Sequence, residues 1–106
     1  MSAGKTIGWG VALTLLVSAC SVTPPVQEMS DARQAISAAE TADAERFAAE
    51  ALEEADALLD SAELNLKRRA YAEARRDAVR AKESAMRARD LAESIRDQSY
   101  RSNDQP

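Results

Sequence analysis

The feature that most constrains the fold is a stretch of 80 residues, 26–105, that contains neither glycine nor proline. These two residues interrupt helices most often, glycine through its backbone freedom and proline through its missing amide donor. Alanine, glutamate, arginine and leucine are abundant in the stretch, and all four favour helix. The sequence therefore predicts an all-α fold. Disorder is the alternative for a chain so charged and so poor in aromatic residues, but the regular apolar spacing opposes it.

Apolar residues recur every three or four positions, as on one face of a helix. They form three runs: Ala32, Ala35, Ala39 and Ala42; then Ala48, Leu52, Ala55, Leu59, Ala62 and Leu66; then Tyr71, Ala74, Ala78, Ala81, Ala85, Ala88, Ala92 and Ile95. Between runs the pattern slips by one and then two positions, or about 100° and 200° around a helix. The slips predict breaks near 43–47 and 67–70. One long helix across either slip is the alternative.

The distribution of charge along the sequence indicates that the chain folds back on itself at the second break. Residues 21–66 hold eleven acids and two bases, whereas residues 67–97 hold ten bases and six acids. Opposite signs favour two segments lying against each other. We therefore expect an Ala-rich antiparallel helical hairpin or small three-helix bundle, with helices at about 26–43, 47–67 and 70–98. Together they form a helical domain at 26–98, followed by a flexible polar tail at 99–106.

The predicted core is small because alanine buries little apolar area. Aromatic residues are scarce: beyond residue 20 only Phe47, Tyr71 and Tyr100 occur. A chain of this length supports one small domain. We therefore expect stability to depend on helix propensity, on close helix approach, or on a partner such as a second copy of the chain.

Residues 1–19 have the pattern of a cleaved signal peptide. A basic start, with Lys5, precedes an apolar segment of about 12 residues, whereas a membrane-spanning helix needs about 20. The segment ends in Val17, Ser18, Ala19 and Cys20, and Cys20 is the single cysteine. An ordinary secretory signal with an incidental cysteine, or an uncleaved anchor, are the alternatives.

These four residues resemble the bacterial lipobox, in which an aliphatic residue and two small residues precede the lipidated cysteine. The resemblance implies cleavage before Cys20, recognition of Val17, Ser18 and Ala19 by the signal peptidase, and a covalent lipid on the Cys20 thiol. Ser21, rather than aspartate, implies sorting to the outer membrane. The lipidated cysteine and a Pro-containing tether would then occupy residues 20–25.

One further group of residues is a candidate for binding. Lys67, Arg68, Arg69, Arg75 and Arg76 form a basic cluster around the second break. It is suited to a partner or an anionic surface, such as lipid or glycan, but a solvated turn paired with acids of the preceding helix is the simpler interpretation.

No other chemistry is indicated. Carboxylates show no recognisable spacing to a nucleophile or base, and the chain has no histidine for a zinc site. We therefore expect no enzyme activity and no cofactor apart from the lipid on Cys20. The net charge of −4 and the predicted export argue against a nucleic-acid partner.

The body also resembles a known family. Residues 32–36 (Ala-Arg-Gln-Ala-Ile), Phe47, residues 50–59 and residues 71–81 follow the order seen in the bacterial domain-of-unknown-function family "forty-three ninety-eight". Its members are short helical lipoproteins, some with an OmpA-like peptidoglycan-binding module that this chain lacks. The resemblance covers roughly residues 25–93. It implies a cell-envelope context but no active residues.

The sequence thus predicts a non-enzymatic outer-membrane lipoprotein that faces the periplasm as an adaptor or structural element. Its expected partners are the membrane, through the lipid, and an envelope protein, peptidoglycan or a second copy. One alternative is a module that binds peptidoglycan, lipid or peptide through the basic turn. Another is a Braun-type coiled-coil lipoprotein, but without the covalent wall link, since no lysine ends this chain.

Overall fold

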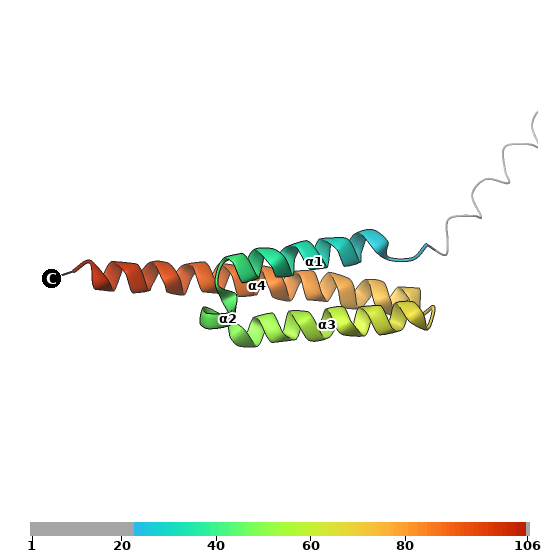
Figure 1. The fold of residues 1–106 in the computed structure, drawn as a ribbon. Helices are drawn as coiled ribbons and strands as arrows, with labels where there is room; N and C mark the ends of the chain where they lie inside the picture. The colour runs from blue at the N-terminus through green and yellow to red at the C-terminus, as the bar shows by residue number, and fades with distance from the viewer. Residues whose placement is uncertain (1–22, 106) are drawn as a thin grey trace, which may run out of the picture.

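A computed structural model of the chain describes residues 23–105, which form four helices and no strand. The helices are α1 (Val26–Thr41), α2 (Ala44–Phe47), α3 (Ala49–Lys67) and α4 (Tyr71–Asn103). α1 and α4 run in the same direction, and α3 runs antiparallel to both (Figure 1). The predicted all-α class and the small bundle of three long helices are confirmed. The single helical turn α2 is an addition at the first break.

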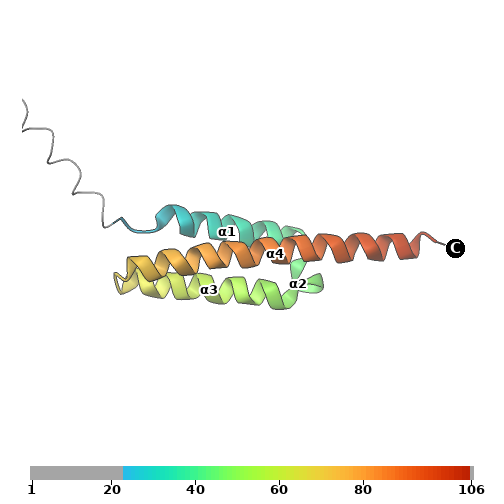
Figure 2. The ribbon, with the colours of Figure 1, turned by 180° about the vertical axis from the view of Figure 1, so that it is seen from behind.

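α4 is the central helix of the bundle. It packs against both α1 and α3, whereas α1 and α3 contact each other over a much smaller surface (Figures 1 and 2). Its buried residues lie on one stripe: Ala74, Ala78, Ala81, Ser84, Ala85, Ala88 and Ala92. All six alanines belong to the third apolar run predicted from the sequence. Ser84 is the one buried position of α4 that apolar spacing did not predict.

The core is built almost entirely of alanine. Among the described residues, thirteen of the sixteen buried hydrophobic residues are alanines, and the other three are Met29, Ile36 and Leu52. Such small side chains fill the space between helices only when the backbones lie close together. The fully buried Ser84 shows this approach, because its Oγ donates a hydrogen bond of 3.5 Å to the carbonyl oxygen of Ala51 in α3. Close helix contact therefore replaces large side chains as the source of packing.

The first break redirects the apolar stripe. α1 ends at Thr41, Asp43 takes a left-handed conformation with φ 67°, and α2 adds one turn before α3 begins at Ala49. Ala42, Ala44 and Ala48 are buried in this corner, in one cluster with residues of α1, α3 and α4. The bend thus allows the runs on both sides of the phase slip to face α4, as the slip predicts.

The second turn ends α3 with a Schellman motif. The amide of Ala70 donates to the carbonyl of Asn65 at 2.8 Å, and the amide of Arg69 donates to Leu66 at 3.0 Å. This pattern requires a left-handed residue, usually glycine, at the position that Arg69 holds with φ 61°. An arginine there carries a steric penalty that glycine would not.

We expect Arg69→Gly to raise the free energy of unfolding by about 1 kcal/mol, because glycine enters the left-handed region without a Cβ clash. Urea denaturation of the full chain, followed by far-ultraviolet circular dichroism, measures the change. Arg68→Gly is the matched control, since Arg68 has the right-handed φ of −81° and gains nothing from glycine. An equal rise in both variants would contradict the steric explanation.

The helix ends correct two predicted boundaries. α1 ends at Thr41 instead of residue 43, and α4 continues to Asn103, five residues beyond the predicted end at 98. Residues 99–103 of the predicted flexible tail 99–106 are therefore helical in the structure. Backbone hydrogen bonds continue the helix although residues 97–103 are all exposed, and the side chains of Ser99 and Ser102 donate to carbonyls of the preceding turn at 3.0 and 3.4 Å.

Candidate functional site

The predicted lipid anchor lies outside the described residues. Val17, Ser18, Ala19 and Cys20 all precede Thr23, the first described residue. The structure does show where the chain that follows them joins the bundle. Pro25 is buried as the N-cap residue of α1, and its carbonyl accepts the first helical hydrogen bond, from the amide of Met29 at 3.1 Å. The end of the predicted tether is thus part of the packed structure.

Arg75 fixes this entry point against the start of α4. Its Nη2 donates to the carbonyl oxygen of Thr23 at 2.8 Å, and its Nε lies 3.1 Å from Oε1 of Glu28 in α1. These contacts join residues about fifty positions apart in the sequence. They place the N-terminal entry of the bundle beside the α3–α4 turn, as Figure 1 also shows. Arg75, one of the five predicted contact residues, therefore has a structural role.

The other four predicted residues share one exposed surface, which we call the basic end. It consists of Lys67, Arg68, Arg69 and Arg76, all exposed around the α3–α4 turn. Within residues 23–105 none of these four side chains forms an ion pair. Of the simpler interpretation from the sequence, the solvated turn describes them, whereas the pairing with acids of the preceding helix does not. Their charges face solvent at the end where the chain enters.

Ion pairs between helices lie elsewhere. Arg33 of α1 contacts Glu63 of α3 at 3.0 Å, and Arg87 of α4 lies 3.8 Å from Glu54 of α3. All four side chains are at least two-fifths exposed, so each pair contributes little stability. Within residues 23–105 the predicted attraction between an acidic α3 and a basic α4 therefore takes the form of one exposed ion pair, Arg87–Glu54.

Asp77 is the centre of a polar contact near the α3–α4 turn. Its Oδ2 accepts hydrogen bonds from Ser61 Oγ at 2.6 Å and from Asn65 Nδ2 at 3.0 Å, both on α3. The three side chains are half-buried. Directional bonds of this kind fix the position of α3 along the axis of α4. Alanine packing alone specifies this position poorly. This contact therefore holds the basic end in position.

The opposite end of the bundle carries an aromatic corner that sequence reasoning did not identify. A recess of about 160 Å³ is lined by Asp43, Arg46, Phe47, Arg96, Ser99, Tyr100 and Asn103. The guanidinium of Arg46 stacks over the Phe47 ring at 5.0 Å. Tyr100 joins this corner because α4 continues past residue 98. The absence of glycine and proline up to residue 105 was the signal for that extension.

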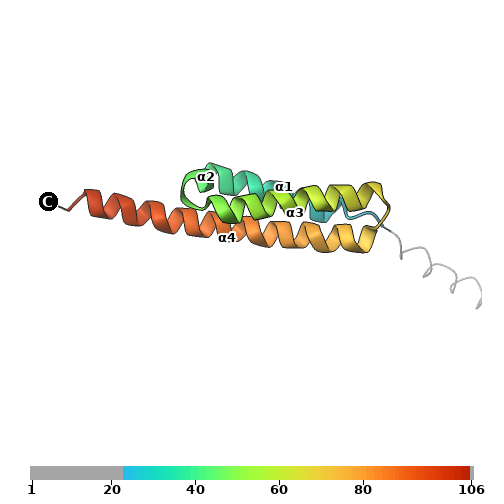
Figure 3. The same ribbon diagram turned by 90° about the horizontal axis from the view of Figure 1, so that it is seen from below.

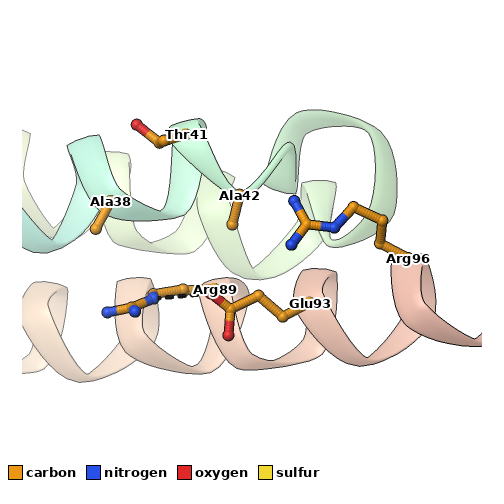
Figure 4. Close-up of a pocket in the computed structure, with 6 residues that line it drawn as sticks. All are labelled: Ala38, Thr41, Ala42, Arg89, Glu93 and Arg96. Atoms are coloured by element: carbon orange, nitrogen blue, oxygen red, sulfur yellow. Dashed lines mark hydrogen bonds and ion pairs between the residues drawn. The ribbon is translucent and has the colours of Figure 1, made fainter.

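Side chains of α1 and α4 line a shallow groove along the bundle (Figure 4). Its α1 side is formed by Ala38, Thr41 and the following Ala42, and its α4 side by Arg89, Glu93 and Arg96. The Thr41 hydroxyl points away from α4 and donates to the carbonyl of Ser37 at 2.9 Å. Arg89 Nε donates to Glu93 Oε1 at 3.1 Å, so these two charges largely neutralise each other. The groove brings together no nucleophile with a base.

Two further findings concern the described part of the chain. Residues 23–105 contain no group of acidic or sulfur side chains arranged to hold a metal ion. None of their helices combines the length and the apolar character needed to cross a bilayer. Both findings concern residues 23–105 only.

Comparison with known proteins identifies no family for this chain. Neither a protein-family model, nor a curated protein, nor a solved structure matches the chain. The resemblance to the family "forty-three ninety-eight" therefore stays a prediction.

Proposed function

We propose that the chain is a non-enzymatic lipoprotein of the outer membrane, anchored through Cys20, whose bundle extends into the periplasm as an adaptor or structural element. The lipobox residues at 17–20 support the anchor. The arrangement of the bundle supports the adaptor, because the chain enters at one end and α4 projects at the other.

The projecting end of α4 is the observation that carries this proposal. Beyond Ile95 and Arg96, which are half-buried, residues 97–103 are all exposed although they remain helical. Figure 3 shows this segment continuing alone past α2. Tyr100, on this segment, is 66 % exposed. A large and mostly exposed aromatic side chain at the end of a bundle is typical of a contact surface for another protein.

The length of α4 determines how far the projecting end lies from the membrane. Its 33 residues span about 50 Å at 1.5 Å per residue. With the entry point at the membrane, Tyr100 is expected to lie tens of ångströms from the bilayer surface. An anchored rod of this kind presents its contact surface at a set distance, as an adaptor between membrane and periplasm requires.

In-cell crosslinking tests the adaptor role. A photoreactive phenylalanine analogue at Tyr100 is expected to give one discrete crosslinked product, an envelope protein or a second copy of this chain, identified by mass spectrometry. The matched control is the same analogue at Ala57, an exposed position in the middle of α3. Equal or diffuse products from both positions would contradict a specific contact at the projecting end.

A further inference from the structure

We propose that the basic end of the bundle lies on the anionic phospholipid headgroups of the membrane that holds the anchor. The inference rests on the proposed function, because it takes Cys20 to be lipidated. It adds an orientation and a second membrane contact: the α3–α4 turn faces the bilayer, and α4 points away from it.

The short connection between Cys20 and the bundle keeps the basic end close to the membrane. Cys20 precedes Thr23 by three residues, which reach at most about 11 Å when fully extended. Arg75 binds the Thr23 carbonyl and also belongs to the second turn of α4. The exposed charges of Arg68, Arg69 and Arg76 therefore stay within a short distance of any lipid attached to residue 20.

The charge distribution selects this orientation. Residues 67–76, at the entry end, hold five bases and one acid, and this end stays positive when the neighbouring Glu28 and Asp77 are included. Residues 40–56, around the α2 corner and the first part of α3, hold seven acids and one base. The net charge of the whole chain is negative, so an anionic surface repels the molecule on average. It attracts the entry end and repels the α2 corner, and both forces turn the basic end toward the bilayer.

The basic end is also available for this contact. Its four side chains are exposed and form no ion pair within residues 23–105. Lipid phosphates at the bilayer surface are acceptors that guanidinium groups bind through two parallel hydrogen bonds. The acyl chains hold the protein at the bilayer, and the basic end adds an electrostatic contact that fixes how the bundle lies on it.

The test uses the full chain, produced with its leader and purified from membranes, with acylation of Cys20 checked by mass spectrometry. Lipidation consumes the only natural thiol, so Ala72→Cys provides a unique site for a fluorescent label at the entry end. Ser102→Cys, at the projecting end, is the matched control; both positions are exposed. The proteins are reconstituted into vesicles of phosphatidylcholine, with or without 30 % phosphatidylglycerol, that carry a headgroup quencher.

Quenching of the label at residue 72 is expected to rise at least about twofold when phosphatidylglycerol is present, and to return to the neutral-vesicle value in 1 M salt, where screening acts over about 3 Å. The label at residue 102 should show neither change. Combined Arg68→Gln, Arg69→Gly and Arg76→Gln substitutions should abolish the rise. The Arg69→Gly variant is also measured by itself. Because this change relieves backbone strain, unfolding would not explain a loss of quenching in it.

Each of the other outcomes would overturn a specific part of the proposal. An acylated chain with equal quenching in both vesicles overturns the headgroup contact and leaves the anchor intact. Unacylated Cys20 overturns the proposed function together with this contact. If the substitutions leave quenching unchanged but abolish retention on cell-wall sacculi, the basic end binds peptidoglycan and the lipid assignment is wrong.

Discussion

Cys20→Ser is expected to leave the leader uncleaved and the protein without lipid, so that the protein no longer reaches the outer-membrane fraction. Serine lacks the thiol that accepts the diacylglyceryl group, and lipobox processing follows that modification. Each buried methylene contributes about 0.8 kcal/mol to membrane binding, so losing the acyl chains leaves only the apolar segment of the uncleaved leader to hold the protein at a membrane. Fractionation and mass spectrometry of the N-terminal peptide measure both effects.

The matched control is Ser18→Ala, which keeps a small residue two positions before the cysteine and should preserve processing. The helical bundle is expected to stay folded in the serine variant, because the packing described above involves only residues 23–105. Circular dichroism checks this. If the serine variant were still cleaved, the leader would be an ordinary secretory signal. If it stayed uncleaved and were distributed between the membranes as the parent protein is, the leader would be an uncleaved anchor. Either result would remove the basis of the proposed orientation.

Much of this fold follows from the phase of one apolar pattern. The slips after Ala42 and Leu66 predicted both breaks, because a stripe that changes sides cannot face a single neighbour along a straight helix. The pattern could not predict α2, because its four residues span only about one period of 3.6 residues, and a repeat is recognised only over several periods. Nor could it predict where α4 ends, since residues 97–103 bury nothing and remain helical through backbone hydrogen bonds alone.

The sequence predicted that these basic residues form a cluster, but it did not predict where the cluster lies in the bundle. Lys67, Arg68 and Arg69 are neighbours in the sequence, and Arg76 follows two helical turns later. Their position relative to the tether depends on the contact of Arg75 with Thr23, which joins residues 52 positions apart. Local spacing carries no information about such a contact. The sequence also does not separate Arg75 from its neighbours, although Arg75 alone has partners in α1 and the tether.

Ser84→Leu is expected to be among the most destabilising single changes in the bundle, at about 3 kcal/mol or more, because added methylenes would overpack a filled site. Ser84 has no exposed surface, and its hydroxyl already reaches the carbonyl of Ala51 in α3. A leucine would push α3 and α4 apart and separate the alanine pairs on both sides of it. A domain of this size has a total stability of only about 4–12 kcal/mol.

Ser94→Leu is the matched control, since Ser94 lies on the same helix but is exposed; it should change stability by less than about 0.5 kcal/mol. Thermal denaturation should show a fall in Tm of more than about 10 °C for Ser84→Leu, and little change for Ser94→Leu. If both variants melted with the parent protein, α3 and α4 would tolerate a wider spacing than close alanine packing requires. The bundle would then owe its stability to something other than close helix approach, most directly to a partner, and the projecting end of α4 would be the first place to look for it.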